Sequence, residues 1–315
     1  MAEDSSQTAE GSSPAAEGSS KTAENTALQG HARIHSRRSE LPDREFQRIV
    51  SLVPSLSEAL SVLELGDRLV GVTEYCVHPK GAFGGLPRLG GTKDADVRSI
   101  IELSPDLVIA NHEENTARVV RRLAEAGIDI WLTYPRTVRE GATLFRELAG
   151  LGAAAAAVER WVVPVERAVE VAMLRADGSA RRPKVFCPIW RDPWMTIARD
   201  TYIHDMIELC GGQNLFAGLD TPARRRYPIV TLDDVVRAQP DVILLPDEPY
   251  AFAEADRKQL SAIDCPAARE ARIHLIDGTL VSWYGPRIAE AIRVLARIFA
   301  DRARAGSGPR IGFGS

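Results

Sequence analysis

The sequence has few aromatic residues, few cysteines and no long apolar run. Aromatic residues make up 6% of its 315 residues, and its four cysteines include no CxxC pair. This spacing argues against a disulfide scaffold and against a structural zinc site. No stretch approaches the roughly 18 consecutive apolar residues that a transmembrane helix needs, so the sequence predicts none.

A strong net charge and catalytic motifs are also missing. The formal net charge is −4, which gives no reason to expect nucleic acid or an anionic membrane surface as a partner. The glycine-rich segment GAFGGLPRLGG at residues 81–91 fits neither the GxGxxG pattern nor the Walker pattern, and no GxSxG or HExxH motif occurs. These absences favour a binding protein over an enzyme.

Large apolar residues are scarce near the N-terminus. Residues 1–45 are rich in serine, alanine, glutamate and threonine, so they bury too little surface to offset chain entropy, and we expect them to be disordered. A secretory signal would need a basic start, an apolar core of about 7–15 residues and a cleavage site. Neither that pattern nor a lipoprotein anchor is visible before Ile49, so the sequence predicts a cytoplasmic protein.

One sequence pattern occurs twice. ELSPDLVIA (residues 102–110) and RAQPDVILL (residues 237–245) each end a helix at a Pro-Asp pair and continue into an apolar run. Proline blocks helix continuation, and such a run is typical of a buried strand. Short strands and amphipathic helices alternate around both segments, as in parallel βαβ units. In the first unit, Ser55 and Glu58 have the spacing of a helix capping box.

These patterns predict an α/β fold with two similar three-layer lobes, at residues 46–135 and 183–303, each built on a parallel sheet. Residues 136–182 show helical periodicity without strand patterns, and Pro164 is expected to kink them. They predict one long connecting helix of about 40 residues, or about 60 Å, with a ligand cleft between the lobes. Residues 304–315 are expected to form a flexible tail.

The loops after the predicted strands hold most of the aromatic residues. Ligand sites in parallel sheets lie beyond the carboxyl ends of strands, and interfaces between domains are favoured positions for pockets. The aromatic residues in these loops predict a site for a large, flat or apolar ligand, with packing between the lobes as the alternative. They are Tyr75, Tyr134, Trp190, Trp194, Tyr250, Trp283 and Tyr284.

Charged and metal-ligating residues occupy the same loops. Arg136, Arg191 and Arg287 are candidates to bind amide, phosphate or carboxylate groups at the rim of a ligand, or else are solvated surface charges.

Glu74, Cys76 and His78 alternate along the chain and so share one face of an extended segment. His112 precedes two glutamates, Glu113 and Glu114. These sets are candidates for zinc, and His78 or His112 for an axial ligand to cobalt, with ordinary polar loop residues as the alternative.

The chain resembles the substrate-binding proteins of ABC importers for cobalamin and iron–siderophores, the helical-backbone metal receptors. The segments that carry the resemblance are VPSLSEA, LSPDLVIA and CGGQNLF, and it covers about residues 47–302. The cobalamin-binding branch is the most similar, and Tyr75 aligns with an aromatic residue that its members place against the corrin ring.

The resemblance implies a monomer with no intrinsic cofactor that holds one corrinoid between its lobes. It also implies an ABC permease as partner and the periplasm as the alternative location. The alternative ligands are an iron–siderophore or haem. A metalloenzyme with a cofactor at the lobe interface is the third alternative, with Cys76 and Cys187 as the two cysteines at strand ends.

The expected docking positions depart from the family pattern. Members of the family usually offer one acidic residue from each lobe to the permease. Asp233 fits this pattern, but the first lobe has Arg98 at the corresponding position. Since an arginine repels basic residues of a permease, the chain is expected to be either an importer component or a soluble relative of one.

Overall fold

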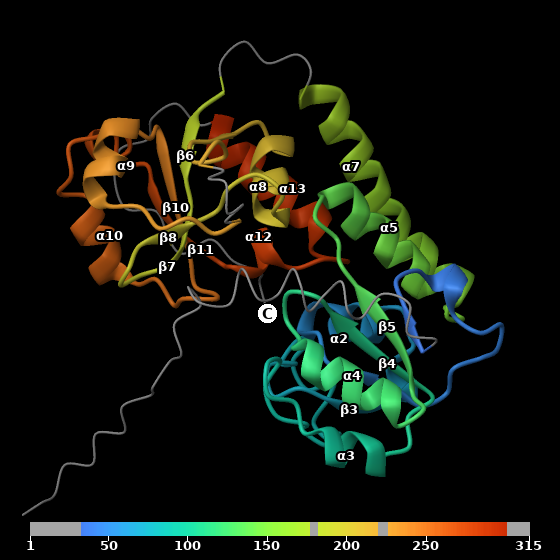
Figure 1. Cartoon of the computed structure of the whole chain (residues 1–315). Helices are drawn as coiled ribbons and strands as arrows, with labels where there is room; N and C mark the ends of the chain where they lie inside the picture. Colours follow the sequence, from blue (N-terminus) through green and yellow to red (C-terminus); the bar gives the residue numbers. More distant parts are fainter. Residues whose placement is uncertain (1–32, 177–181, 220–225, 301–315) are drawn as a thin grey trace, which may run out of the picture.

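The computed structural model describes residues 33–176, 182–219 and 226–300, and two separate parallel sheets organise them (Figure 1). The first sheet has the order β1-β5-β4-β2-β3, and all its neighbouring strands are parallel. Its strands are β1 (Ile34–His35), β2 (Ile49–Ser51), β3 (Leu69–Val72), β4 (Leu107–Asn111) and β5 (Asp129–Thr133). This sheet forms the centre of the first lobe.

The second lobe is built on a four-stranded parallel sheet with the order β11-β10-β6-β9. Its strands are β6 (Lys184–Phe186), β9 (Gln213–Asn214), β10 (Val242–Pro246) and β11 (Ile273–Ile276). A separate antiparallel pair, β7 (Pro188–Trp190) and β8 (Met195–Thr196), follows β6. The two parallel sheets confirm the predicted α/β class.

The repeated Pro-Asp pattern leads into an interior strand of each sheet. Strands β4 and β10 each lie between two neighbours, and all their residues are buried. A strand covered on both faces needs an apolar run without alternation, which both segments provide. The preceding helices are α3 (Val97–Glu102) and α9 (Leu232–Ala238), as predicted.

Helices cover the sheets by burying one apolar face each. In α4, Thr116 caps the first turn by accepting a hydrogen bond from the backbone of Val119, and Val119, Val120 and Leu123 are buried. The helices of the first lobe are α2 (Pro54–Val62), α3 and α4 (Ala117–Glu125), with η2 (Arg38–Glu40) and η3 (Gly66–Arg68). Those of the second lobe are α8 (Tyr202–Leu209), α9, α10 (Glu254–Leu260), α11 (Pro266–Arg269), α12 (Thr279–Ser282) and α13 (Ile288–Ala300).

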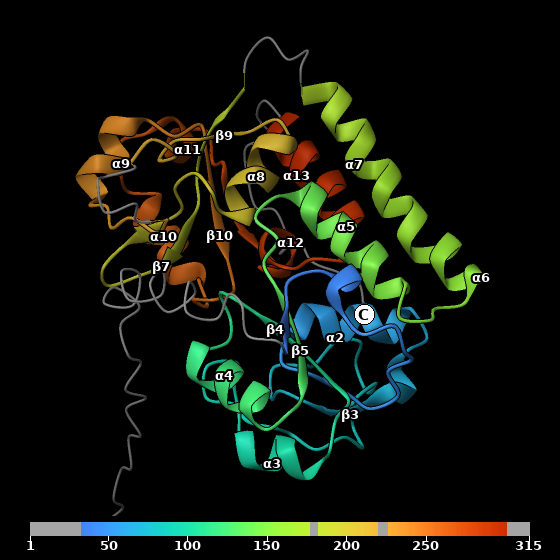
Figure 2. The same ribbon diagram turned by 45° about the vertical axis from the view of Figure 1, so that its right-hand side comes forward.

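The connector is a helical hairpin, so the prediction of one long helix over residues 136–182 is wrong. Helix α5 (Val138–Ala149) ends at Gly150, and the chain turns where Gly152 has a φ of +120°, a conformation that favours glycine. The chain then returns beside α5 as α6 (Ala155–Ala157), the π-turn η4 (Val158–Val162) and α7 (Val163–Ala176) (Figure 2). The π-turn ends at Val162, two residues before Pro164, which has no N–H to donate.

The expected disorder of residues 1–45 does not hold for residues 33–45. Strand β1 pairs with β5, and Leu41 is buried in the core. The buried carboxylate of Asp129 accepts hydrogen bonds from Arg33 and Arg44, both at 3.0 Å. Burial would raise the pKa of Asp129, but these bonds outweigh it and lower the pKa. Residues 1–32 and the expected tail at 304–315 lie outside the described residues.

Asp129→Asn is expected to release this N-terminal segment from the sheet. The amide keeps the shape of the carboxylate but loses its charge, which weakens the bonds from both arginines, and we expect a loss of about 1–3 kcal/mol in the free energy of unfolding. Urea unfolding measures that loss, and amide exchange at Ile130, whose N–H donates to the Arg33 carbonyl oxygen, reports on the pairing. Asp264→Asn, at an exposed ion pair with Arg269, is the control. Unchanged exchange at Ile130 would contradict the prediction.

Candidate ligand-binding site

Loops at the carboxyl ends of both sheets contact each other between the lobes. Glu113, after β4, contacts Arg226 and Tyr227 of the second lobe. His78, in the loop after β3, lies with its ring centre 5.8 Å from that of Trp283. The strand ends that the sequence analysis selected are therefore brought together, as expected for a ligand site between two α/β lobes.

The predicted aromatic residues separate into an exposed pair, a partly exposed pair and a buried set of three. Tyr75 and Tyr134, both from the first lobe, are 60% and 38% exposed. Trp190 and Tyr250 are partly exposed and lie edge to face with ring centres 5.6 Å apart. The third set, Trp194, Trp283 and Tyr284, is buried, and Trp194 stacks on Phe252. The first two pairs leave ring surface accessible, while the third set is packed inside the protein.

The three predicted arginines have different surroundings. Arg136 is exposed, with its guanidinium carbon 5.7 Å from the centre of the Tyr134 ring. Arg191 pairs with Asp256 of its own lobe. Arg287 is only 4% exposed and lies away from any rim. Of the three, Arg136 is the one placed at an accessible edge.

Arg287 links the two lobes through a buried ion pair. Its Nε and Nη2 donate to the two carboxylate oxygens of Glu58 on α2, at 2.6 and 2.8 Å, and its Nη1 donates to the hydroxyl of Thr279 at 2.8 Å. The capping-box role predicted for Glu58 is therefore wrong, because α2 begins at Pro54 and Glu58 points to the other lobe. Two-point pairing of this kind fixes orientation as well as position.

The predicted zinc set in the loop after β3 does not converge. Cys76 faces the core, with its sulfur 3.1 Å from the Ser57 hydroxyl and 3.2 Å from that of Thr73, whereas Glu74 is exposed. Across residues 33–176, 182–219 and 226–300, no group of three His, Cys, Asp or Glu side chains is placed to hold a metal ion. The sequence pattern failed here because a turn replaces the extended backbone that the spacing requires.

The two candidate axial histidines both lie at the face between the lobes. The ring of His112 is 5.1 Å from that of Tyr134, and its buried Nδ1 has no hydrogen-bond partner in the part of the chain that the structure describes. Burial lowers the pKa of His112 although Glu113 opposes this effect, so the ring is neutral at neutral pH. A neutral imidazole nitrogen is the form that coordinates a metal.

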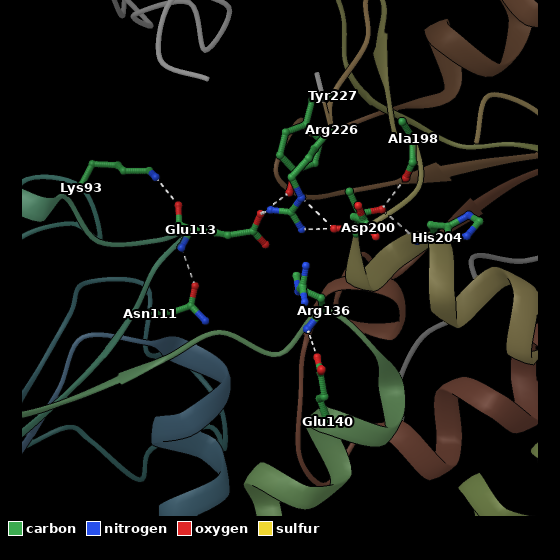
Figure 3. A network of polar contacts seen from close by, with 11 residues as sticks. Lys93, Asn111, Glu113, Arg136, Glu140, Ala198, Asp200, His204, Arg226 and Tyr227 are labelled. Atoms are coloured by element: carbon green, nitrogen blue, oxygen red, sulfur yellow. Dashed lines mark hydrogen bonds and ion pairs between the residues drawn. The ribbon is translucent and has the colours of Figure 1, made fainter. Parts of the chain in front are cut away.

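A polar network joins the lobes at Glu113 (Figure 3). One carboxylate oxygen, Oε1, accepts hydrogen bonds from Arg226 and from the Tyr227 hydroxyl, the latter at 2.7 Å. The guanidinium carbon of Arg226 also lies 5.4 Å from the centre of the Tyr134 ring. Glu113 belongs to a strand-end loop that the sequence analysis selected, but Arg226 and Tyr227 carry no motif that could have revealed them.

A neutral carboxyl group lies beside this network. The pKa of Glu114 is raised to about 8, mainly by burial and secondly by the carboxylate of Glu248 in the second lobe, although Lys93 opposes the shift. Burial also raises the pKa of Glu248, which accepts a hydrogen bond from Ser282 at 2.7 Å. A carboxyl group with its pKa raised to about 8 is mostly protonated at neutral pH and can then donate a hydrogen bond.

Two cavities lie within single lobes. One, of about 470 Å³, is lined by residues at the starts of α3 and α4. The other, of about 600 Å³, is lined by residues around α8 and β9. Neither of these two spans both lobes, where the contacts of Glu113 and Arg287 bring the loops together.

Curated relatives match most of the chain. The "Vitamin B12-binding protein" of Vibrio cholerae serotype O1 is 26% identical over 247 residues, which are 78% of this chain and 86% of that protein. The protein of the same name from Yersinia pestis (strain Pestoides F) is 29% identical over 206 residues, or 65% of this chain and 71% of that protein. Both matches extend over most of the relative's own length.

Solved structures share the fold. The periplasmic vitamin B12 binding protein BtuF of Vibrio cholerae superposes with a TM-score of 0.68 at 24% identity, covering 81% of this chain and 96% of that one. The periplasmic heme-binding protein RhuT from Roseiflexus sp. RS-1, in apo form, gives 0.66 at 24% identity, covering 80% and 97%. At this identity the likeness establishes the fold alone.

The comparisons do not support the predicted cytoplasmic location, because the family and both solved structures are named as periplasmic. Within the described ranges, no helix has the length and apolar character needed to cross a bilayer.

Residues 49–268 match the family described as "Periplasmic binding protein". Since this match covers more than half of the chain, the protein belongs to the periplasmic binding protein family, which confirms the resemblance seen in its sequence.

Proposed function

We propose that this protein binds a corrinoid, a cobalamin-like molecule, between its two lobes and acts as the substrate-binding component of an ABC import system. The observation that carries the proposal is the match to proteins named for vitamin B12 binding, over 86% of the length of the one from Vibrio cholerae and 71% of the one from Yersinia pestis. Two further features support it. Exposed aromatic rings at the strand ends suit an apolar macrocycle, and the neutral carboxyl of Glu114 suits the amide groups around a corrin ring.

The same site is proposed to be non-catalytic and without an intrinsic cofactor. The two strand-end cysteines are buried, and burial raises the pKa of both thiols, that of Cys187 to about 12. A metal cluster would need thiolates. The cysteines therefore favour a role in packing over the alternative of a metalloenzyme, and the cobalt of the corrinoid is expected to arrive with the ligand.

Haem is the alternative ligand, because haem-binding proteins share the fold. An anionic iron–siderophore has less support as the ligand. An anionic ligand favours a basic rim, but of the three arginines predicted at the rim, Arg191 and Arg287 pair with acidic residues of the protein itself, which leaves Arg136.

Docking to a permease is proposed to use the faces of α3 and α9. Asp233 is exposed in the first turn of α9. Arg98 on α3 is exposed and pairs with Glu102 at 2.9 Å, so an acidic side chain offsets its positive charge locally. We propose the periplasm as the place of action and a single copy as the functional unit, in line with the family.

A titration of the full chain with hydroxocobalamin tests the function. We expect saturable one-to-one binding that quenches tryptophan fluorescence and shifts the corrin absorption bands. Tyr75→Ala is expected to weaken binding by about 10- to 100-fold, because a large exposed ring at a site contributes on the order of 1.4–2.8 kcal/mol. Leu174→Ala, which removes another exposed apolar side chain, from α7, is the control.

The outcomes separate the candidate ligands. No saturable binding at high micromolar cobalamin, with tight binding of haem instead, would replace the corrinoid with the alternative ligand. A shifted absorption band that is lost in His78→Ala or in His112→Ala would identify an axial ligand to cobalt. Equal affinities of the Tyr75 and Leu174 variants would contradict the role of the aromatic face.

A further inference from the structure

Two donors of the second lobe converge on one oxygen of the first. Arg226 Nη1 and the Tyr227 hydroxyl both donate to Oε1 of Glu113 (Figure 3), and Arg226 and Glu113 are 113 positions apart in the chain. A guanidinium and a phenol directed at one oxygen match the donor pattern that binds a phosphate or carboxylate oxygen. Glu113 supplies such an oxygen from within the protein.

Contacts within the second lobe hold the donor pair in place. Arg226 Nε donates to the backbone carbonyl oxygen of Asp200 at 2.7 Å, and Nη2 donates to the same oxygen. The guanidinium carbon lies 5.6 Å from the centre of the Tyr227 ring. Burial, as the larger cause, and the Glu113 carboxylate, as the second, raise the pKa of Tyr227 well above its ordinary value, so the phenol keeps its proton. Arg226 therefore has contacts within its own lobe that do not depend on Glu113.

Glu113 belongs to the first lobe and its two donors to the second, so any movement of the lobes apart would remove it from them. The side chains of Arg226 and Glu113 are 23% and 24% exposed, so the guanidinium is largely removed from water. Once Glu113 withdraws, a largely buried cation and a phenol lose their acceptor, which is unfavourable unless another oxyanion replaces it. Arg136, 5.7 Å from the Tyr134 ring that Arg226 also approaches, adds a second guanidinium nearby.

We propose that Arg226 and Tyr227 form an oxyanion subsite that Glu113 occupies in the ligand-free protein and that a phosphate or carboxylate group of the ligand takes over. The proposal rests on ligand binding between the lobes, as proposed above. It assigns Glu113 the role of an internal competitor and Arg226 that of a residue selecting ligands with an anionic group. Cobalamin carries such a group in its nucleotide phosphodiester, and haem carries two in its propionates.

A purely structural ion pair would behave in the opposite way. If the contact only stabilised the closed arrangement around a ligand, loss of Glu113 would weaken binding of every ligand. If Glu113 competes with the ligand, its loss strengthens binding, because the protein no longer breaks an ion pair to admit the ligand. The sign of the change in affinity therefore separates the two roles.

The test compares ligands that differ in the anionic group. Cobinamide lacks the nucleotide and its phosphodiester, and haem dimethyl ester lacks the free propionates. We expect Glu113→Gln to bind cobalamin about 10-fold more tightly than the unmodified protein. We expect Arg226→Met to weaken cobalamin binding by 10-fold or more and cobinamide binding by less than about threefold. Tyr227→Phe, a smaller change, is expected to act in the same direction as Arg226→Met.

Arg269→Met and Asp264→Asn are the matched controls, since they remove the same charges from an exposed pair next to α11. They are expected to leave all affinities unchanged. The subsite is overturned, while corrinoid binding stands, if Arg226→Met weakens the binding of cobalamin and of cobinamide equally. It is also overturned if Glu113→Gln weakens the binding of both. If the unmodified protein binds haem but no corrinoid, the corrinoid function fails, and haem is then compared with haem dimethyl ester. The subsite is overturned if Arg226→Met weakens the binding of both equally. Failure to bind any of the four ligands overturns both.

Discussion

Replacing Glu58 with alanine is expected to lower the free energy of unfolding by about 3–5 kcal/mol. Arg287 is 4% exposed, and Glu58 accepts two of its N–H groups at 2.6 and 2.8 Å. Without the Glu58 carboxylate, the guanidinium stays buried at the junction of the lobes and loses its two shortest charge-assisted hydrogen bonds, while Asp277, 3.7 Å from Nη1, lies farther away. Urea unfolding followed by tryptophan fluorescence measures the loss.

Two comparisons show whether burial is the cause. Glu290→Ala breaks an exposed ion pair with Arg293 on α13 and is expected to cost less than about 0.5 kcal/mol. The double variant Glu58→Leu with Arg287→Met removes both buried charges together and is expected to recover most of the lost stability. A double variant as unstable as Glu58→Ala would show that packing around α2, rather than the broken ion pair, determines the loss.

The stability of the protein is expected to fall as the pH rises from about 4.5 to about 8, in large part because of Glu114. Glutamate ordinarily has a pKa of 4.5, and burial, followed by the Glu248 carboxylate, raises that of Glu114 to about 8. Below pH 4.5 the folded and unfolded chains both hold this proton, so the full stability is present. Between the two values the unfolded chain releases the proton while the folded chain keeps it, and the accumulated loss reaches up to about 5 kcal/mol.

Glu114→Gln is expected to remove most of this slope and to make the protein more stable than the unmodified chain at pH 8. A residual slope of the same sign is expected from Glu248, whose pKa burial also raises. Urea unfolding at pH 5, 6.5 and 8 measures the effect. Glu102→Gln, at an exposed carboxylate on α3, serves as control and leaves the slope unchanged. Parallel stability profiles for the Glu114 variant and the unmodified protein would contradict the prediction.

The sequence was sufficient where structure follows from local pattern. The Pro-Asp segments identified β4 and β10, because proline ends a helix wherever the fold places it and an unbroken apolar run needs burial on both faces. The same reasoning selected the strand-end loops that hold Tyr75, Glu113 and Tyr134. Parallel strands bring their carboxyl ends to one edge of a sheet, so position along the chain predicts position in space.

Local pattern was insufficient where a residue's partner is distant in the chain. Helical periodicity on both sides of Gly150 read as one helix, because the pattern continues across the turn that Gly152 makes. Residues 33–45 read as disordered, because their order depends on Asp129 on another strand. Glu58 had the spacing of a capping box, but its partner is Arg287 in the other lobe.

The sequence by itself therefore determined the α/β class, the family and the loops that face between the lobes. Only the tertiary structure decided which side chains in those loops are accessible and which are already paired. Tyr75 and Arg287 were equal candidates in the sequence, yet one is 60% exposed and the other is held by Glu58. The physical reason is that burial and ion pairing depend on what the opposite lobe presents, and the sequence near a residue does not contain that information.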